Sequence, residues 1–472
     1  MEKVFCHVVC VALVENAASK KDVLNFLSME KPLKEHRDYF MLCDMVWKVD
    51  ENTFYKNFKK IKKLHLTVEV THTIDFSNLW YLKCDTFNEP VEDFKNLTHF
   101  ECLGFNQKVE KFGRLKYFKC YCFNQPLANF GNLTHFECYL FNQPVKSFGK
   151  LTHFKCFWFN QSVSSFGSLT LFQSEFFNGS VSSFNNLTHF KCFHFNQTVS
   201  SFGKLTHFQC FKFNQPVLNF GHLTHFDCSN FNHPVSSFGN LMHFECVCFN
   251  QPVSNFGSLT HFECRCFNQN VASFGDLTHF HCKNFNNPVS SFDKLIHFEC
   301  TRFNQPLTSF GDLRHFCCEN FNQPVSSFDN LIHFESSRFN CSVSSFNNLT
   351  KFECSLFNQP VSNFGTLTHF NSNDFNQSVS SFGDLEHFKC NHFNQPVSSF
   401  DKLQYFECER FNQPVSSFYN LTLFKCYCFN QPLSNFGNLK YFECCWFDQP
   451  VYSFGNLEYF QSLFARKHFD RF

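Results

Sequence analysis

Cysteine and histidine are the residues of this sequence with the widest chemical repertoire. The chain contains 28 Cys and 24 His among 472 residues, and thiolate and imidazole groups are preferred ligands of Zn²⁺. His99 and Cys102 exemplify a His-x-x-Cys pattern that recurs along the chain. On a β-strand, residues separated by an odd number of positions point to opposite faces. The pattern therefore predicts no metal site if these residues lie on strands.

An 18-residue repeat fixes where the Cys and His residues lie. FNQPLANFGNLTHFECYL at residues 123–140 matches FNHPVSSFGNLMHFECVC at residues 231–248, and the register holds from Phe87 to Phe447. With each unit numbered from the Phe of its Phe-Asn pair, Phe fills positions 1, 8 and 14 in all 21 units. Leu fills position 11, Val or Leu fills position 5, and Cys or Ser fills position 16. A fixed period of this length is typical of a solenoid.

These six positions predict the interior of each coil. The spacing Leu-x-x-Phe-x-Cys matches the frame of leucine-rich repeats, in which a short strand lines one face. Positions 12–16 therefore predict a parallel strand with positions 14 and 16 facing inward. Gly, Asn or Asp at position 9 in 19 units predicts a left-handed turn. Eighteen residues leave no room for a full helix, so we expect turns or a short 3₁₀ segment elsewhere.

The predicted fold is a β-rich solenoid of 21 tandem coils. It covers residues 87–460, after a degenerate first coil at residues 61–86 that contains Phe76, Leu79 and Cys84. A small helical module is predicted at residues 1–60, and residues 461–472 are predicted to cover the last coil.

Three columns of equivalent residues have structural interpretations. Cys at position 16 faces inward once per coil and is replaced by Ser in four coils, which favours reduced, buried thiols over disulfides. Asn at position 2 predicts an internal ladder of amide hydrogen bonds. His at position 13 in 14 coils predicts an exposed column. Because neighbouring imidazolium groups would repel, we expect this column to be mostly neutral at pH 7.

Position 17 carries the candidate target-binding residues. In the early coils it is aromatic, and three lysines lie in the adjacent position 15 column. An exposed aromatic stripe with cations is typical of a protein-binding patch. The alternative interpretation is that the rings pack into the turn. The residues concerned are Lys119, Tyr121, Tyr139, Lys155, Phe157, Lys191, Phe193 and Phe211.

Composition argues against several functional classes. The 40 Lys and Arg balance the 40 Asp and Glu, so the net charge is +0 and no basic face for nucleic acid is indicated. The sequence has no apolar stretch of the roughly 18 residues needed for a transmembrane helix. We find no nucleophile–base–acid group and no glycine-rich phosphate loop within the repeat, so we expect neither catalysis nor a cofactor.

The motifs FNQPV and FNQPL, which follow an L-T-H-F segment, resemble those of the FNIP repeat family. The resemblance extends over residues 76–460. Units of that family read much like LTHLTFGxxFNQPL, and they are longer than the 18-residue units of this chain. The resemblance implies a leucine-rich-repeat relative of the kind found in social amoebae and giant DNA viruses.

The N-terminal segment SKKDVLNFLSMEKPLKEHRDYFML resembles the F-box-like start of viral and amoebal FNIP proteins. Its Ser-x-x-Asp start is typical of a helix N-terminus, although the usual Leu-Pro opening is missing. The resemblance implies docking onto the SKP-type adaptor of a cullin ubiquitin ligase, with the solenoid holding the target. The alternative is a helical cap on a scaffold with no ligase link. The implied adaptor-binding residues are Val23, Leu24, Phe26, Leu27, Leu33 and Phe40.

Secretion is the third alternative. Residues 4–14 form an apolar run before Ala17 and Ala18, as in a signal peptide. Against it, His7 interrupts the run, and Asn160 would become a glycosylation acceptor inside the Asn ladder. We therefore expect a cytoplasmic location, which is the host cytoplasm if the protein is viral.

Overall fold

The computed structural model describes residues 63–66 and 79–462 of the chain. Within that span it leaves out residues 185, 218–219, 254–255, 344–345, 347, 362–363, 380, 398–399, 401, 416–417, 419, 434–435 and 451–454. The predicted helical module, with Val23, Leu24, Phe26, Leu27, Leu33 and Phe40, lies outside the described residues, as do residues 463–472.

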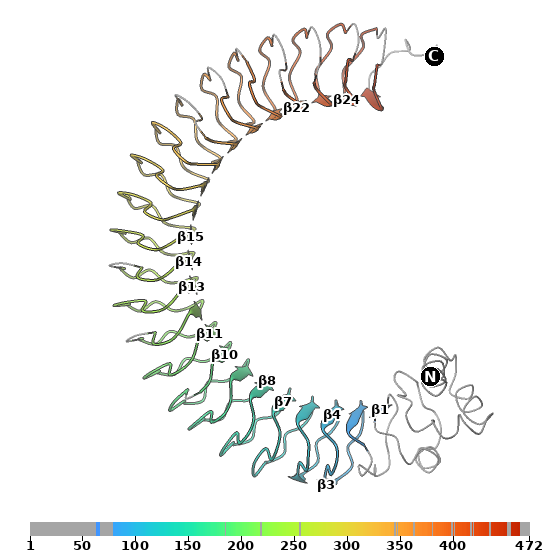
Figure 1. Cartoon of the computed structure of the whole chain (residues 1–472), viewed down its shortest axis with the longest axis vertical. Coiled ribbons are helices and arrows are strands. Elements are labelled where there is room, and N and C mark those ends of the chain that lie inside the picture. Colours follow the sequence, from blue (N-terminus) through green and yellow to red (C-terminus); the bar gives the residue numbers. More distant parts are fainter. Residues whose placement is uncertain are drawn as a thin grey trace, which may run out of the picture. The chain divides into compact units, whose positions relative to one another are not determined.

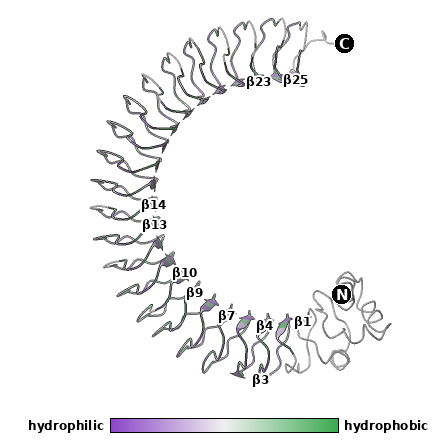
Figure 2. Cartoon of the chain, in the orientation of Figure 1, coloured by the Kyte–Doolittle hydropathy of each residue, from purple (hydrophilic) through white to green (hydrophobic). Residues whose placement is uncertain are grey.

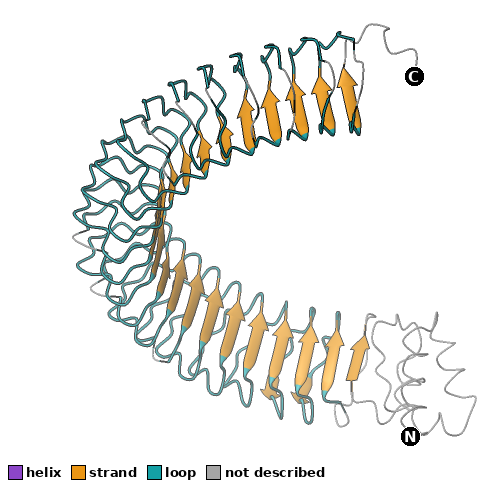
Figure 3. Cartoon of the chain, turned by 45° about the horizontal axis from the view of Figure 1, so that its top comes forward, coloured by secondary structure: helices purple, strands orange, loops and turns teal. Residues whose placement is uncertain are grey.

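The described residues form a parallel β-solenoid of about 20 coils of 18 residues, which divides into two compact units between Phe231 and Asn232. Each coil contributes one strand to the same side of its unit (Figure 1). No described residue is helical, and turns and loops make up the rest of each coil (Figure 3).

The strands have nearly the same bounds in every coil. In the first unit they are β1 Lys63–Leu66, β2 Tyr81–Cys84, β3 Val91–Asp93, β4 His99–Cys102, β5 Val109–Lys111, β6 Tyr117–Cys120, β7 His135–Cys138, β8 His153–Cys156, β9 Leu171–Ser174, β10 His189–Cys192, β11 His207–Cys210 and β12 His225–Asp227. In the second unit they are β13 His243–Cys246, β14 His261–Cys264, β15 His279–Cys282, β16 His297–Glu299, β17 His315–Cys317, β18 His333–Glu335, β19 Lys351–Glu353, β20 His369–Asn371, β21 His387–Cys390, β22 Tyr405–Cys408, β23 Leu423–Cys426, β24 Tyr441–Cys444 and β25 Tyr459–Ser462.

Neighbouring strands pair in parallel with a shift of one repeat, so equivalent residues become partners. In β14 and β15, for example, His261 pairs with His279 and Phe262 with Phe280. The ladder starts one residue before the strand, where the Thr134 N–H donates to the carbonyl of Lys116 at 2.8 Å. This confirms the strand expected at positions 12–16. A second short pairing, β3 with β5, was not predicted.

Side chains alternate between the interior and the solvent along each strand. β4, with the sequence HFEC, has its Phe and Cys buried and its His and Glu partly exposed, and strands in Figure 2 carry both hydrophobic and hydrophilic colours. Phe at positions 1, 8 and 14 and Leu at position 11 are almost fully buried wherever they are described, except for Leu457 and Phe460 of the last coil, which are half-buried. Position 5 is less interior than predicted, because Leu127, Val145 and five further residues there are only half-buried.

Equivalent Phe rings stack in three columns. In the second unit, Phe262 and Phe280 have ring centroids 5.5 Å apart, and Phe267 and Phe285 are 6.0 Å apart. On the opposite face of the same strands, His261 and His279 are only 4.3 Å apart. Successive coils of this unit are therefore closer together at the exposed strand face than in the core.

The position 16 side chain closes each coil with a hydrogen bond to a buried carbonyl. The Cys264 thiol donates to the carbonyl oxygen of Phe249 at 3.1 Å, and Cys120 donates to Phe105 at 3.0 Å. Where Ser replaces Cys the same bond persists, as from Ser336 to Phe321 at 2.9 Å. The column therefore selects a small side chain that donates a hydrogen bond, which explains why Cys and Ser interchange.

The Asn column forms the predicted ladder. The Oδ1 atom of Asn106 accepts from the backbone N–H of Asn124 at 2.9 Å, and Asn124 does the same for Asn142. Gln at position 3 adds a second donor to the same oxygen, as from Gln143 Nε2 at 3.2 Å. The ladder is thus a structural device that links each coil to the next.

The turn at position 9 has the predicted left-handed backbone. All 14 glycines there have positive φ, with Gly149 at 56°, and Asp293 at 49° replaces Gly in the same conformation. The turn is closed by the N–H of the position 11 Leu, which donates to the position 8 Phe carbonyl, as from Leu151 to Phe148 at 3.0 Å. Turns, with no 3₁₀ segment among the described residues, complete each coil.

Candidate functional site

The position 17 side chains of the first unit form an exposed stack of aromatic rings. Tyr121 and Tyr139 have ring centroids 4.3 Å apart, and Tyr139 and Phe157 are 4.4 Å apart. Tyr121 remains 46% exposed. After an interruption at Glu175, Phe193 stacks on Phe211 at 4.5 Å. Tyr121, Phe193 and Phe211 are exposed and Tyr139 and Phe157 are half-buried, so the rings pack on one another and are not enclosed in the turn.

A second aromatic column lies beside the first, at position 18. Trp158 stacks on Phe176 at 4.0 Å, and Phe176 stacks on His194 at 4.7 Å. Lys212 continues this column and lies over the Phe193 ring at 5.9 Å. The position 18 residues were not predicted as part of the site, although the 18-residue period places them one position after the aromatic residues of position 17.

The lysines of position 15 flank the aromatic stack on the strand side. Lys119 pairs with Glu137 at 3.1 Å, while Lys155 and Lys191 make no ion pair within the part of the chain that the structure describes. The hydrogen bond to the Glu137 carboxylate raises the pKa of Lys119. Two ammonium groups on β8 and β10 are therefore available to a ligand.

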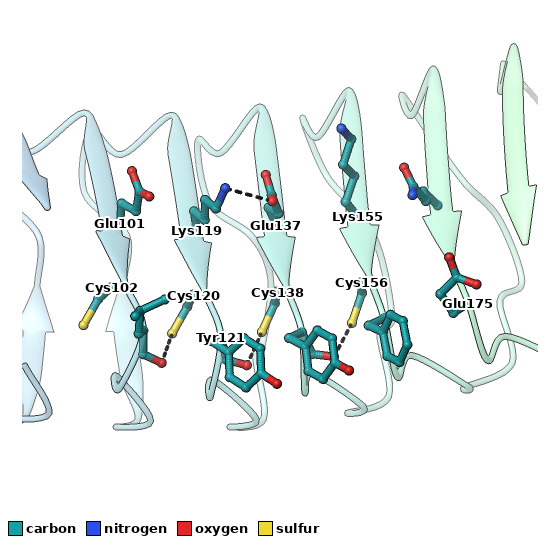
Figure 4. Close-up of a pocket in the computed structure, with 14 residues that line it drawn as sticks. Glu101, Cys102, Lys119, Cys120, Tyr121, Glu137, Cys138, Lys155, Cys156 and Glu175 are labelled. Atoms are coloured by element: carbon teal, nitrogen blue, oxygen red, sulfur yellow. Dashed lines mark hydrogen bonds and ion pairs between the residues drawn. The ribbon is translucent and has the colours of Figure 1, made fainter. Parts of the chain in front are cut away.

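Some of these aromatic and lysine side chains line a groove of about 340 Å³ on the first unit. Figure 4 shows Lys119, Glu137 and Lys155 on adjacent strands, with Tyr121 beyond the carboxyl end of β6. The structure places five predicted residues in the groove, and the other three, Lys191, Phe193 and Phe211, follow on the next coils. The five in the groove are Lys119, Tyr121, Tyr139, Lys155 and Phe157. We call all eight residues, together with Trp158, Phe176 and Lys212, the aromatic–lysine surface.

The buried thiols are poorly suited to nucleophilic chemistry. Burial raises the pKa of Cys156 and of Cys264 to about 12. Only a thiolate is a competent nucleophile or metal ligand, so these two thiols stay protonated at neutral pH and act as hydrogen-bond donors.

The His column is stacked and exposed along one edge. His207 and His225 have ring centroids 4.2 Å apart. The Thr206 hydroxyl donates its one proton to the Thr188 carbonyl at 3.0 Å. The same hydroxyl oxygen lies 3.0 Å from His207 Nδ1. Because the hydroxyl has no second proton, it must accept this hydrogen bond from a protonated Nδ1. In a neutral His207 ring, Nε2 is therefore the nitrogen without a proton.

Burial, followed by the neighbouring imidazoles, lowers the pKa of His207 and of His279. We expect an NMR titration to give both residues pKa values below the ordinary value of about 6.5. The folded state then binds fewer protons than the unfolded state between the two pKa values, so the free energy of unfolding decreases as pH falls below about 6.5. His207→Gln should reduce this acid sensitivity, whereas pKa values above 7 for the column would refute a neutral stack.

In the described residues there is no helix with the length and apolarity that crossing a membrane requires.

Comparison with known proteins defines the class of the fold. No family model matches the chain, and no curated protein does. Among solved structures, the chain is similar to a leucine-rich-repeat protein, and its fold is a leucine-rich-repeat-like solenoid.

One similar solved structure is CroV588 of the giant virus CroV, described as a novel circular LRR protein. It matches with a TM-score of 0.60 and 21% identity, over 86% of this chain and 79% of that one. The functional domain of InlJ from Listeria monocytogenes, described as including a cysteine ladder, matches with a TM-score of 0.41 and 14% identity, over 73% and 71% of the two chains.

Proposed function

We propose that this chain is a non-enzymatic interaction protein that holds a protein partner on the aromatic–lysine surface. The observation that carries the proposal is the exposure of stacked rings, of which Tyr121, Phe193 and Phe211 are 46%, 37% and 45% exposed. Contiguous exposed aromatic groups of this kind mark interaction sites, and Tyr, Trp and Phe are enriched in the buried centres of interfaces.

The charges beside the rings define the partner's chemistry. Lys155 and Lys191 lie on the strand side of the stack, and Lys212 lies over Phe193. Opposite charge at an interface provides specificity and raises the association rate. The surface fits an extended protein segment that carries acidic side chains next to aromatic or aliphatic ones.

A peptide selection tests this proposal. Peptides selected from a random library on the full chain should be enriched in Asp or Glu next to apolar residues. Phe193→Ala and Lys155→Glu should each weaken their binding by at least about tenfold, because aromatic and charged anchors carry most of the binding energy. The matched control is Lys283→Glu, which changes an exposed lysine of the second unit. Equal losses with the control, or peptides without acidic residues, would contradict the proposal.

We further propose that the chain is an FNIP-type protein whose F-box-like N-terminus links it to a cullin ubiquitin ligase in the cytoplasm. The support is the resemblance of residues 19–42 to F-box-like segments and of the FNQP and LTHF words to FNIP repeats. The solenoid would then hold a target while the N-terminus binds the SKP-type adaptor. The alternative is a scaffold with no ligase link.

A pull-down separates the two alternatives. Full-length chain should retain a purified SKP-type adaptor, and the double variant Leu24→Asp, Leu27→Asp should not. The control is Leu356→Asp, which changes a side chain that is 46% exposed on the solenoid. If the unaltered chain fails to retain the adaptor while the solenoid binds its peptides, the ligase link is refuted and the scaffold remains.

A further inference from the structure

The exposed face of β17 and β18 brings together three metal-ligating side chains. Cys317 and Glu335 are direct partners in the register of the two strands. His333 lies two residues before Glu335, so it points to the same face of the sheet. Cys317 is the one Cys at position 15 of the repeat, where it faces solvent instead of the core. Among the described residues this is the only such group of three with its ligand atoms in mutual reach.

The three ligand atoms are already close together. The Cys317 sulfur, a His333 ring nitrogen and a Glu335 oxygen all lie within 4.8 Å of one another, and His333 Nε2 is 3.9 Å from Glu335 Oε2. In a tetrahedral zinc site, bonds of about 2.0–2.3 Å place donor atoms roughly 3.3–3.8 Å apart. Closure therefore needs side-chain movements of about 1 Å, on a backbone that the strand pairing already holds.

The orientation of His333 differs from the rest of its column. His297 and His315 are parallel to within 7°, whereas the His333 ring stands at 87° to that of His315. The next residue of the column is Lys351, which offers no ring to stack on.

As a result, His333 Nε2 is buried and has no hydrogen-bond partner. A buried polar atom without a partner is costly and calls for an explanation. A metal ion between His333 and the facing Cys317 and Glu335 would satisfy that nitrogen.

We propose that Cys317, His333 and Glu335 bind one divalent transition metal ion of the Zn²⁺ class. Burial, followed by the Glu335 and Glu299 carboxylates, raises the pKa of the Cys317 thiol to about 12, so it is the charge of the bound ion that makes the thiol release its proton to solvent. A thiolate and a carboxylate then neutralise the two charges of the ion, and a water molecule takes the fourth position. The sulfur and imidazole ligands select Zn²⁺ or Co²⁺ over Ca²⁺ and Mg²⁺, which prefer all-oxygen sites.

Cobalt is the probe that tests the site, because a thiolate ligand gives Co²⁺ a near-ultraviolet charge-transfer band. Reduced, metal-free, full-length chain should develop this band and bind one equivalent that Zn²⁺ displaces. Cys317→Ser should abolish the band and remove one equivalent. The band and stoichiometry should be unchanged in Cys341→Ser, a half-buried thiol of the same unit outside the cluster.

Two further variants separate ligand loss from misfolding. Glu335→Gln and His333→Gln change side chains on the outward strand face, so we expect their thermal unfolding in the absence of metal to match that of the unaltered chain. Each should weaken cobalt binding at least about tenfold, as expected when a ligand is lost. A cobalt band of unaltered intensity and affinity in Cys317→Ser, or the absence of any band in the unaltered chain, would overturn the proposal.

Discussion

Replacing Phe298 with Ala is expected to lower the free energy of unfolding by about 3–5 kcal/mol. The ring is 1% exposed and lies between its equivalents in the neighbouring coils, Phe280 at 5.4 Å and Phe316 at 5.5 Å. It also contacts Phe303, edge to face, at 5.0 Å. Removing the ring opens a cavity, which Phe280 and Phe316 cannot fill because the neighbouring coils hold them in place. Denaturant unfolding of the full chain, followed by fluorescence or circular dichroism, would measure the loss.

The matched control for Phe298 lies two residues earlier in the same coil. Ile296 is 38% exposed, so Ile296→Ala should change the free energy of unfolding by less than about 1 kcal/mol. Equal effects of the two substitutions would mean that the ring at position 14 does not face a packed interior.

Replacing Cys264 with Val is expected to cost about 1–3 kcal/mol. The thiol is 1% exposed and donates to the carbonyl oxygen of Phe249 at 3.1 Å. Valine has a similar volume but no donor, so it would leave that buried carbonyl without this hydrogen bond. The free energy of unfolding in denaturant would report the loss.

Cys264→Ser is the informative comparison, because the protein itself uses Ser in this place. Ser372 donates to the Phe357 carbonyl at 3.0 Å, with the geometry of its Cys counterparts. The serine variant should therefore be closer in stability to the unaltered chain than the valine variant is. A valine variant as stable as the serine variant would show that apolar burial alone selects the side chain.

Much of the fold could be predicted from the sequence because equivalent residues have the same environment in every coil. Phe262 and Phe280 occupy the same position, so one assignment of the inward face holds for every coil. The left-handed turn could be predicted from Gly149 and its equivalents, since few other residues tolerate that backbone. The donor role of Cys264 could not, because it depends on where the Phe249 carbonyl points.

The candidate sites were predicted less completely, for reasons of geometry. The column that contains Tyr121 and Phe193 stands out by composition, whereas Trp158 and Phe176 gain meaning only from stacking on each other. The proposed metal site was not predicted, because the His-x-x-Cys pattern pairs His and Cys of one coil. Cys317 and His333 instead come from adjacent coils, and only strand register brings them together.

Alkylation of the native chain, mapped by mass spectrometry, tests the central claim that each 18-residue unit is one winding with fixed inward positions. Four coils provide internal pairs, each with a buried Cys and a half-buried Cys two residues later: Cys120 and Cys122, Cys246 and Cys248, Cys264 and Cys266, and Cys426 and Cys428. We predict that iodoacetamide modifies the second member of each pair in the native chain and the first member only after denaturation. Equal modification of both members in the native chain would contradict the solenoid.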